Sequence, residues 1–173
     1  QANVHAGYGE ALVGVAKGTV TQEAKNAFDK AIKADPTEPR ARYFEALWLA
    51  QHGWTAVGVD RSALAIESAR RKADWTTGAM FVEGDVTRLD DLEVDGPFDL
   101  LLDIGCFHGV PARRRGAYVR QVSRVAGPGA RMMIFAFGPI VRWPGTTRTR
   151  ETEIRRRFGE AFELERVVPG RDP

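Results

Sequence analysis

The stretch from Thr55 to Asp60 (TAVGVD) constrains the fold more than any other part of the sequence. It is a short apolar run with β-branched residues that ends on a carboxylate, and helix-period sequence, residues 62–73, follows it at once. A short apolar run that leads directly into a helix is typical of a parallel strand and its crossover connection. Asp60 is therefore predicted at the carboxyl end of a strand, the edge at which open α/β sheets bind ligands.

Two roles for Asp60 are compatible with that position. Its carboxylate can accept hydrogen bonds from both hydroxyls of a ribose, or it can cap the helix that follows, which is a common role of aspartate. Ser62 comes two residues later and could cap this helix instead, which would leave Asp60 available to a ligand. The residues alone leave the two roles open.

The alternation of strands and helices continues through the rest of the chain. Further strands are predicted at residues 79–85, 98–103, 130–137 and 162–168, and further helices at residues 111–126 and 150–158. Such an alternation indicates a doubly wound, mostly parallel α/β sheet. Three of the predicted strands end on Asp60, Asp85 and Asp103. The carboxyl ends of parallel strands share one edge, so the three carboxylates favour a nucleoside-type site there.

Residues 1–53 are predicted to be helical. Thr21 is predicted to cap a helix in which small and large apolar residues recur at three- and four-residue spacing from Ala24 to Ile32. Asp35-Pro36 ends that helix, and Pro39 marks where the next one can begin. The segment TVTQEAKNAFDKAIKADPTEPRARYFEAL resembles the tetratricopeptide repeats of c-type cytochrome biogenesis proteins. It covers roughly one and a half repeats, which is too few for a repeat array on its own. The other interpretation is a helical hairpin that covers another core.

A second resemblance covers about residues 47–170. The segments ALWLAQHGWTAVGVDRSALAIESARR, FVEGDVTRLDDL, PFDLLLDIGCFHGV and SRVAGPGARMMIFAFGP resemble class I S-adenosylmethionine-dependent methyltransferases, in particular the thiopurine/tellurite-resistance-like small-molecule branch. The resemblance implies an incomplete Rossmann-like methyltransferase domain at residues 47–173, preceded by a tetratricopeptide-like segment at residues 1–46. It also implies S-adenosylmethionine as the cofactor and a small molecule as the methyl acceptor.

The same resemblance implies roles for ten site residues, which lie in three short groups. Asp60, with Arg61 beside it, would hold the ribose; Asp85 and Val86 would contact the adenine; Asp103, Ile104 and Gly105 would line the methionine end; Cys106, Phe107 and His108 would face the acceptor. His108 could accept the proton of the acceptor, because the unperturbed pKa of histidine is close to neutral pH. The alternatives are a structural His108 bonded to backbone, a packed Cys106 and a core Phe107.

The sequence also departs from the family. Family members carry a first strand and a glycine-rich DxGxGxG turn before the segment that begins at Ala46, whereas helical sequence precedes it here. The chain also ends soon after the strand predicted at residues 162–168. We therefore expect two joined fragments, with a seam within about Tyr43 to Gly53, and an impaired cofactor site. A replacement strand at residues 11–16 is a less favoured alternative. The rival function is a non-catalytic scaffold, in which residues 1–53 bind a protein partner.

Composition narrows the other function classes. The formal net charge of +2 is small, and the arginine runs at residues 113–115 and 155–157 are expected to be solvated helix faces, so no nucleic-acid partner is predicted. The single cysteine, Cys106, has no metal-ligand spacing around it, and no metal is predicted. No apolar run approaches the ~18 residues of a membrane span. A cytoplasmic location is the expectation, although the chain begins at Gln1 rather than Met.

Overall fold

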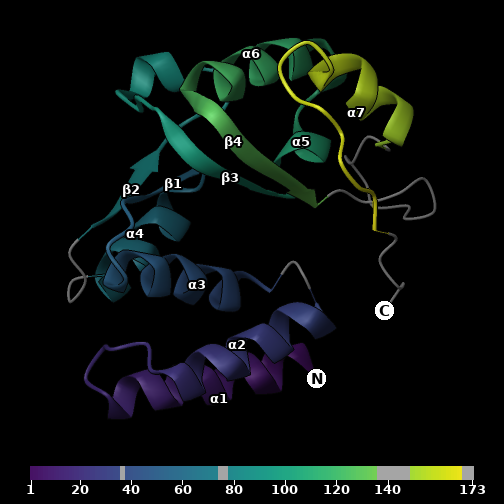
Figure 1. Cartoon of the computed structure of the whole chain (residues 1–173). Coiled ribbons are helices and arrows are strands. Elements are labelled where there is room, and N and C mark those ends of the chain that lie inside the picture. Colours follow the sequence, from purple (N-terminus) through teal and green to yellow (C-terminus); the bar gives the residue numbers. More distant parts are fainter. Residues whose placement is uncertain (36–37, 74–77, 136–148, 169–173) are drawn as a thin grey trace. The chain divides into compact units, whose positions relative to one another are not determined.

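The computed structural model describes residues 1–35, 38–73, 78–135 and 149–168, which belong to two compact units (Figure 1). The first unit, Gln1–Asp85, contains α1 (Ala2–Val15), α2 (Gln22–Ala34), α3 (Pro39–Gln51), β1 (Ala56–Asp60), α4 (Ala63–Ala73) and β2 (Ala79–Glu83). The second unit, Val86–Pro173, contains η1 (Leu89–Leu92), β3 (Phe98–Ile104), α5 (Cys106–Gly109), η2 (Ala112–Arg114), α6 (Arg115–Val125), β4 (Ala126–Phe135) and α7 (Glu151–Phe158).

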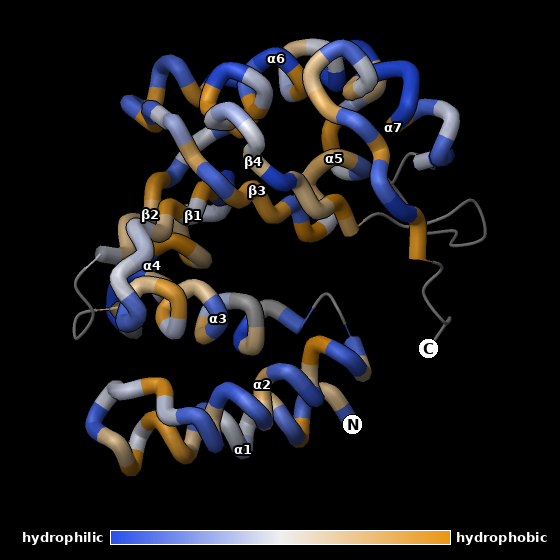
Figure 2. Tube along the Cα trace, in the orientation of Figure 1, coloured by the Kyte–Doolittle hydropathy of each residue, from blue (hydrophilic) through white to orange (hydrophobic). Residues whose placement is uncertain are grey.

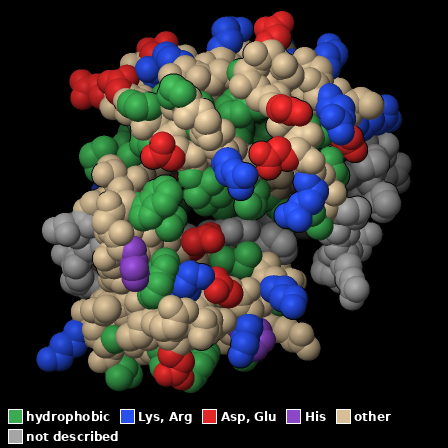
Figure 3. All heavy atoms as spheres, in the orientation of Figure 1, with side chains coloured by type: hydrophobic (Ala, Val, Ile, Leu, Met, Phe, Trp, Pro, Cys, Tyr) green, Lys and Arg blue, Asp and Glu red, His purple; other side chains and the backbone are tan. Residues whose placement is uncertain are grey.

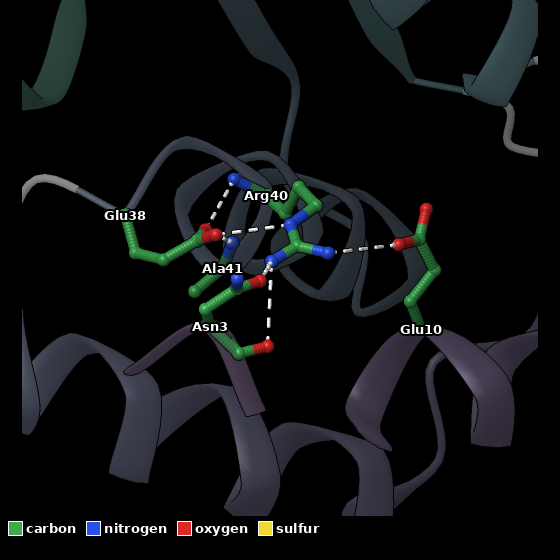
Figure 4. A network of polar contacts seen from close by, with 5 residues as sticks. All are labelled: Asn3, Glu10, Glu38, Arg40 and Ala41. Carbon is green, nitrogen blue, oxygen red and sulfur yellow. Dashed lines mark hydrogen bonds and ion pairs between the residues drawn. The ribbon is translucent and has the colours of Figure 1, made fainter. Parts of the chain in front are cut away.

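The N-terminal helices begin at residues whose side chains satisfy free backbone amides. Thr21 caps α2, as the sequence predicts, because its Oγ1 accepts a hydrogen bond from Ala24 N at 3.2 Å. Glu38 caps α3 by accepting from the backbone amides of Arg40 (2.7 Å) and Ala41 (3.0 Å). Figure 4 shows that the Arg40 guanidinium also extends to Asn3 and lies 3.7 Å from Glu10 Oε2. Polar contacts therefore tie the start of α3 to α1.

The helix α3 packs against two layers of the first unit. One side meets α1 and α2, where Phe44 stacks on Phe28 with ring centroids 4.5 Å apart. The other side meets β1 and β2, where the Tyr43 ring lies 5.7 Å from that of Phe81. Hydrophobic and hydrophilic residues alternate along α2 in Figure 2, as expected of a helix with one buried face. The repeat-like helices and the first two strands thus share one hydrophobic core.

The strands form two separate parallel pairs within the described residues. The pair β1–β2 runs in continuous register from Ala56 opposite Ala79 to Asp60 opposite Glu83. The pair β3–β4 is parallel as well, with an irregularity in register between Phe98 and Leu100. Parallel strands with helical crossovers confirm the α/β class, and the incomplete sheet agrees with the absence of the first strand from the sequence.

Several predicted boundaries were wrong. The described residues 162–168 form no strand: Phe162 packs on the core of the second unit, whereas Val167 and Val168 are exposed. Residues 11–15 belong to α1 and Ala16 is its C-cap, which excludes the alternative of a replacement strand there. Helix was predicted from residue 111 and begins as the short η2 before α6. The predicted end of the fourth strand, residues 136–137, lies outside the described residues.

The predicted seam falls within α3, which is one uninterrupted helix. The boundary between the two compact units follows Asp85 instead. A compact unit can contain segments of different evolutionary origin, so the seam at Tyr43 to Gly53 stays a prediction. No helix of the described segments is long and apolar enough to cross a lipid bilayer.

Candidate functional site

The carboxylate of Asp60 lies at the end of β1 and is exposed to solvent. Its Oδ1 accepts a hydrogen bond from the backbone amide of Ser62 at 2.8 Å, which stabilises the turn into α4. The cap of α4 is Ser62 itself, whose Oγ accepts from Ala65 N at 3.2 Å. Among the described residues, no group donates a hydrogen bond to Asp60 Oδ2. One carboxylate oxygen is thus fixed by the turn, and the other is open to solvent.

The other predicted residues of the first unit, Arg61 and Asp85, lie beside the same strand ends. Arg61 is exposed in the turn after β1. The strand β2 ends at Glu83, two residues earlier than predicted, so Asp85 lies in the connection that follows. A hydrogen bond from Gly84 N to Asp60 O (2.9 Å) holds the ends of β1 and β2 together just before Asp85. The remaining predicted site residues, from Val86 onward, belong to the second unit.

Asp103 has a different environment from Asp60. It is the penultimate residue of β3 and is only 3% exposed. Its carboxylate accepts hydrogen bonds from the backbone amides of Cys106 (2.8 Å) and Phe107 (3.0 Å) and from Tyr118 Oη (2.6 Å). These donors bind Asp103 to the first turn of α5 and to α6. The carboxylate therefore acts as a buried cap of α5 in this structure.

Burial dominates the electrostatics of this pair. It raises the pKa of Asp103, and the hydrogen bonds from Tyr118, Phe107 and Cys106 oppose that rise only in part. The pKa of Tyr118 is raised even more strongly, by burial first and then by the charge and hydrogen bond of Asp103. Tyr118 consequently keeps its proton and remains the donor throughout the neutral pH range.

Replacing Tyr118 by phenylalanine is expected to lower the free energy of unfolding by about 1.5–3 kcal/mol at neutral pH, because a buried bond to a charged acceptor is lost. The loss should shrink to about 0.5–1.5 kcal/mol in acid, where Asp103 is protonated. Urea unfolding at both pH values measures this. Tyr8→Phe is the matched control, because Tyr8 Oη also donates to a carboxylate, that of Glu23, but at the surface. Equal effects of the two substitutions would contradict the expectation.

The short helix α5 contains the three residues predicted to face the acceptor. It begins after Gly105, whose φ of +81° is unfavourable for other residues, and a Cβ there would crowd the His108 ring at 3.0 Å from Cε1. Phe107 is fully buried in the core of the second unit, Cys106 is half-buried and His108 is 7% exposed. Burial, and then the positive charge of Arg115, lower the pKa of His108, so its imidazole is neutral at pH 7.

Arg115 is a buried residue that the sequence interpretation missed. The arginine run at residues 113–115 was expected to be solvated, yet Arg115 is 1% exposed and forms an ion pair with Glu153 of α7 at 2.7 Å. A signal for this was present in the sequence. Arg115, Tyr118 and Val122 follow one another at spacings of three and then four residues, which places Arg115 on the apolar face of α6.

The surface of the second unit is hollowed near the start of α7. A depression of about 490 Å³ is lined by Arg150, Thr152, Glu153 and Arg156. The residues predicted to bind cofactor and acceptor are different ones, although Glu153 joins the depression to Arg115. Acidic and basic side chains are interspersed over the face drawn in Figure 3. In the described parts of the chain, no cluster of histidine, cysteine and carboxylate side chains could hold a metal ion.

Part of the chain matches the model of a known protein family. A family described as a methyltransferase domain matches residues 40–129, just over half of the chain. This range includes all ten predicted cofactor and acceptor residues, from Asp60 to His108.

Similar proteins include methyltransferases. A 2-heptyl-1-hydroxyquinolin-4(1H)-one methyltransferase of Mycobacteroides abscessus is 31% identical over 131 residues, which are 73% of this chain and 57% of that protein. An uncharacterized methyltransferase of Schizosaccharomyces pombe is 30% identical over 109 residues, which are 60% of this chain and 74% of that protein. A structure solved in work on the conversion of a disulfide bond into a thioacetal group during echinomycin biosynthesis shares 28% identity, with a TM-score of 0.57. The match covers 70% of this chain and 58% of that one.

The tetratricopeptide resemblance has weaker support. The cytochrome c-type biogenesis protein CycH of Rhizobium meliloti is 44% identical over 69 residues, which are 40% of this chain but only 18% of that protein. This chain thus spans little more than half of the quinolone methyltransferase and less than a fifth of CycH.

Proposed function

Because this chain belongs to the methyltransferase domain family, we propose that it transfers a methyl group from S-adenosylmethionine to a small-molecule acceptor. The observation that supports this most directly is Asp60, a solvent-exposed carboxylate at the carboxyl end of β1 whose Oδ2 accepts no hydrogen bond from the described residues. Ser62 caps the following helix, so Asp60 is not needed there. The oxygen is available to ribose hydroxyls, and S-adenosylmethionine carries a ribose.

The residues of the first unit fit the nucleoside part of this cofactor. Asp60 and Arg61 would hold the ribose, and Asp85 would contact the adenine, together with Val86. S-adenosylmethionine, once bound, supplies an electrophilic methyl group on a sulfonium that leaves readily. The chain therefore needs to bind and orient the two substrates rather than to activate the donor.

In the second unit, Asp103 supports the methionine end indirectly. Its carboxylate is already occupied by the donors from α5 and α6, so it holds the turn at Ile104 and Gly105 in place. The backbone of Gly105 can approach a ligand closely because it carries no side chain. His108 follows in α5 as the candidate proton acceptor, and its neutral imidazole has the protonation state which that role requires.

The names of similar proteins support an acceptor of low molecular weight. One relative is named for a hydroxyquinolone and a structural neighbour for echinomycin biosynthesis. We propose that this chain also accepts a small organic molecule, in the cytoplasm. The glycine-rich turn typical of the family is not found before Ala46, so we expect weaker cofactor binding than a complete site would give.

Calorimetric titration of the full chain with S-adenosylmethionine tests this proposal. We expect saturable binding that weakens about 10- to 100-fold in Asp60→Asn, because charge-assisted hydrogen bonds to the ribose are lost while the amide oxygen can still accept from Ser62 N. Glu67→Gln is the matched control: it removes one exposed carboxylate of α4, and its affinity should equal that of the wild type. Unchanged affinity in Asp60→Asn would refute the assigned site.

One observation favours the rival function of a scaffold. The large apolar side chains of Val4, Tyr8 and Val15 on α1 are 73%, 53% and 84% exposed, which is the pattern of a helix face that meets a partner. The same titration separates the two functions. A folded chain that binds no S-adenosylmethionine would favour a partner-binding role for the N-terminal helices.

A further inference from the structure

Arg115, the first residue of α6, is a buried positive charge with contacts in three directions. Its Nη1 donates to Glu153 Oε2 at 2.7 Å, its Nε donates to the carbonyl oxygen of Val110 at 3.1 Å, and its Nη2 donates to that of His108 at 3.2 Å. The guanidinium also lies 4.7 Å from the ring centroid of Phe107. The planar fork of arginine spreads its donors over three nitrogens in fixed directions, whereas lysine donates from a single nitrogen, so lysine is not its equivalent here.

Two of these contacts, those with the carbonyl oxygens of His108 and Val110, lie at the end of α5. A helix of four residues cannot hold its shape alone, because helix formation requires a costly first turn. Asp103 fixes the first turn of α5 by accepting from Cys106 N and Phe107 N. Arg115 binds the carbonyl groups at the other end. The segment that contains the predicted acceptor-facing residues is therefore held at both ends by buried charges.

We propose that Arg115, itself held by Glu153, is a positioning residue that fixes the end of α5 and thereby places His108 for the methyl acceptor. Burying a charge is costly, and a guanidinium that only joined two helices could be replaced by apolar packing. The hydrogen bonds to the carbonyl oxygens of His108 and Val110 require a donor such as the guanidinium, which apolar packing cannot replace. The role of α5 toward the methyl acceptor rests on the proposed function. The effect of Arg115 on the position of α5 can be measured without cofactor.

His108 reports on this arrangement because its backbone contacts Arg115 and the charge of Arg115 acts on its ring. The charged or titratable residues of the cluster are Arg115 and Tyr118 on α6, Glu153 on α7, Asp103 on β3 and Cys106 on α5. Arg115 lowers the pKa of His108, after burial. Burial acts to raise the pKa of Glu153, but the hydrogen bonds and charges of Arg157 and Arg115 outweigh it, so this pKa is lowered and Glu153 is ionised at neutral pH.

Nuclear magnetic resonance titration of the histidine ring signals of the full chain tests the proposal. The sequence contains three histidines, so His5 and His52 are internal references. We expect Arg115→Met to raise the pKa of His108, because a positive charge is removed. Glu153→Gln should lower the pKa of His108 below its value in the wild type, because the negative charge that compensates Arg115 is removed. The amide oxygen of the new side chain can still accept the hydrogen bond from Arg115. Arg124→Met, on the same helix, should leave it unchanged.

Hydrogen exchange separates the geometry of the fork from its charge. Arg115→Lys keeps the charge but cannot reach all three acceptors, so the amide of Val110, which donates to Cys106 O at 3.0 Å, should exchange about tenfold faster. Arg124→Lys is the matched control, because Arg124 also binds a carboxylate, that of Asp95 (3.0 Å), and a carbonyl, that of Val94 (3.1 Å). Exchange at Val110 should be unaffected by this control.

Unchanged titration of His108 in Glu153→Gln, or unchanged exchange of Val110 in Arg115→Lys, would overturn the proposal. Glu153→Gln also serves if Arg115→Met fails to fold. The cofactor titration described above is independent of these measurements. If the pKa of His108 rises in Arg115→Met and falls in Glu153→Gln, but the chain binds no S-adenosylmethionine, methyl transfer is refuted and the role of Arg115 in positioning α5 stands. Cofactor binding without these shifts would refute the role of Arg115 alone.

Discussion

Replacing Phe28 by alanine is expected to reduce the free energy of unfolding of the first unit by about 3–5 kcal/mol. Phe28 is 2% exposed, its ring stacks on Phe44, and Gly9 lies so close that a Cβ there would be 2.6 Å from a ring carbon. Removing the ring leaves a cavity that these neighbours cannot fill without moving. Since small domains are stable by about 5–15 kcal/mol, a large part of the stability would be lost.

The informative measurement is hydrogen exchange at the strand amides of β1 and β2. The helices α1–α3 share a core with these strands. Exchange should therefore accelerate at Val59 and Val82, although both residues are far from Phe28 in the sequence. Val15→Ala is the control, because Val15 is 84% exposed and its truncation should change stability by less than about 0.5 kcal/mol. Acceleration confined to α1 and α2 would show that the repeat-like helices are an appendage.

This expectation follows from a feature that the sequence showed only in part. The spacing of Ala24, Phe28 and Ala31 predicted the buried face of α2, and Thr21 and Pro39 predicted the starts of two helices; the structure confirms all of these. The pattern of α3 was ambiguous, because the helix has apolar residues on more than one side. In the structure both sides are used, by Phe44 toward α2 and by Tyr43 toward β2.

For the candidate site, local geometry was predictable and tertiary contacts were not. The strand at Thr55–Asp60 and the cap at Ser62 follow from residues close in sequence, and both are found. The bond from Tyr118 to Asp103 spans fifteen residues and the pair of Arg115 with Glu153 spans thirty-eight. Such pairs depend on how helices pack, which periodicity does not determine. The strand predicted at residues 162–168 failed for a related reason, since a strand also needs a neighbour to pair with.

The two carboxylates singled out by the sequence, Asp60 and Asp103, should respond to alanine substitution in opposite ways. Asp103→Ala leaves Cys106 N, Phe107 N and Tyr118 Oη without their acceptor, and buried donors without a partner cost about 1–3 kcal/mol each. We expect a loss of about 3–5 kcal/mol in the free energy of unfolding. Asp60→Ala should weaken cofactor binding but leave the unfolding midpoint nearly unchanged, because Asp60 is exposed.

The pH dependence of stability distinguishes a buried carboxylate from a merely polar cap. Burial raises the pKa of Asp103 above its ordinary value of 3.8, so the folded state favours the protonated form. The resulting contribution to stability is complete below pH 3.8 and is lost as the pH rises through the raised pKa. Asp103→Asn, which cannot ionise, should lack this decline in urea unfolding between acid and neutral pH. An identical pH profile in wild type and variant would mean that Asp103 is not desolvated, and its assignment as a buried positioning residue would fail.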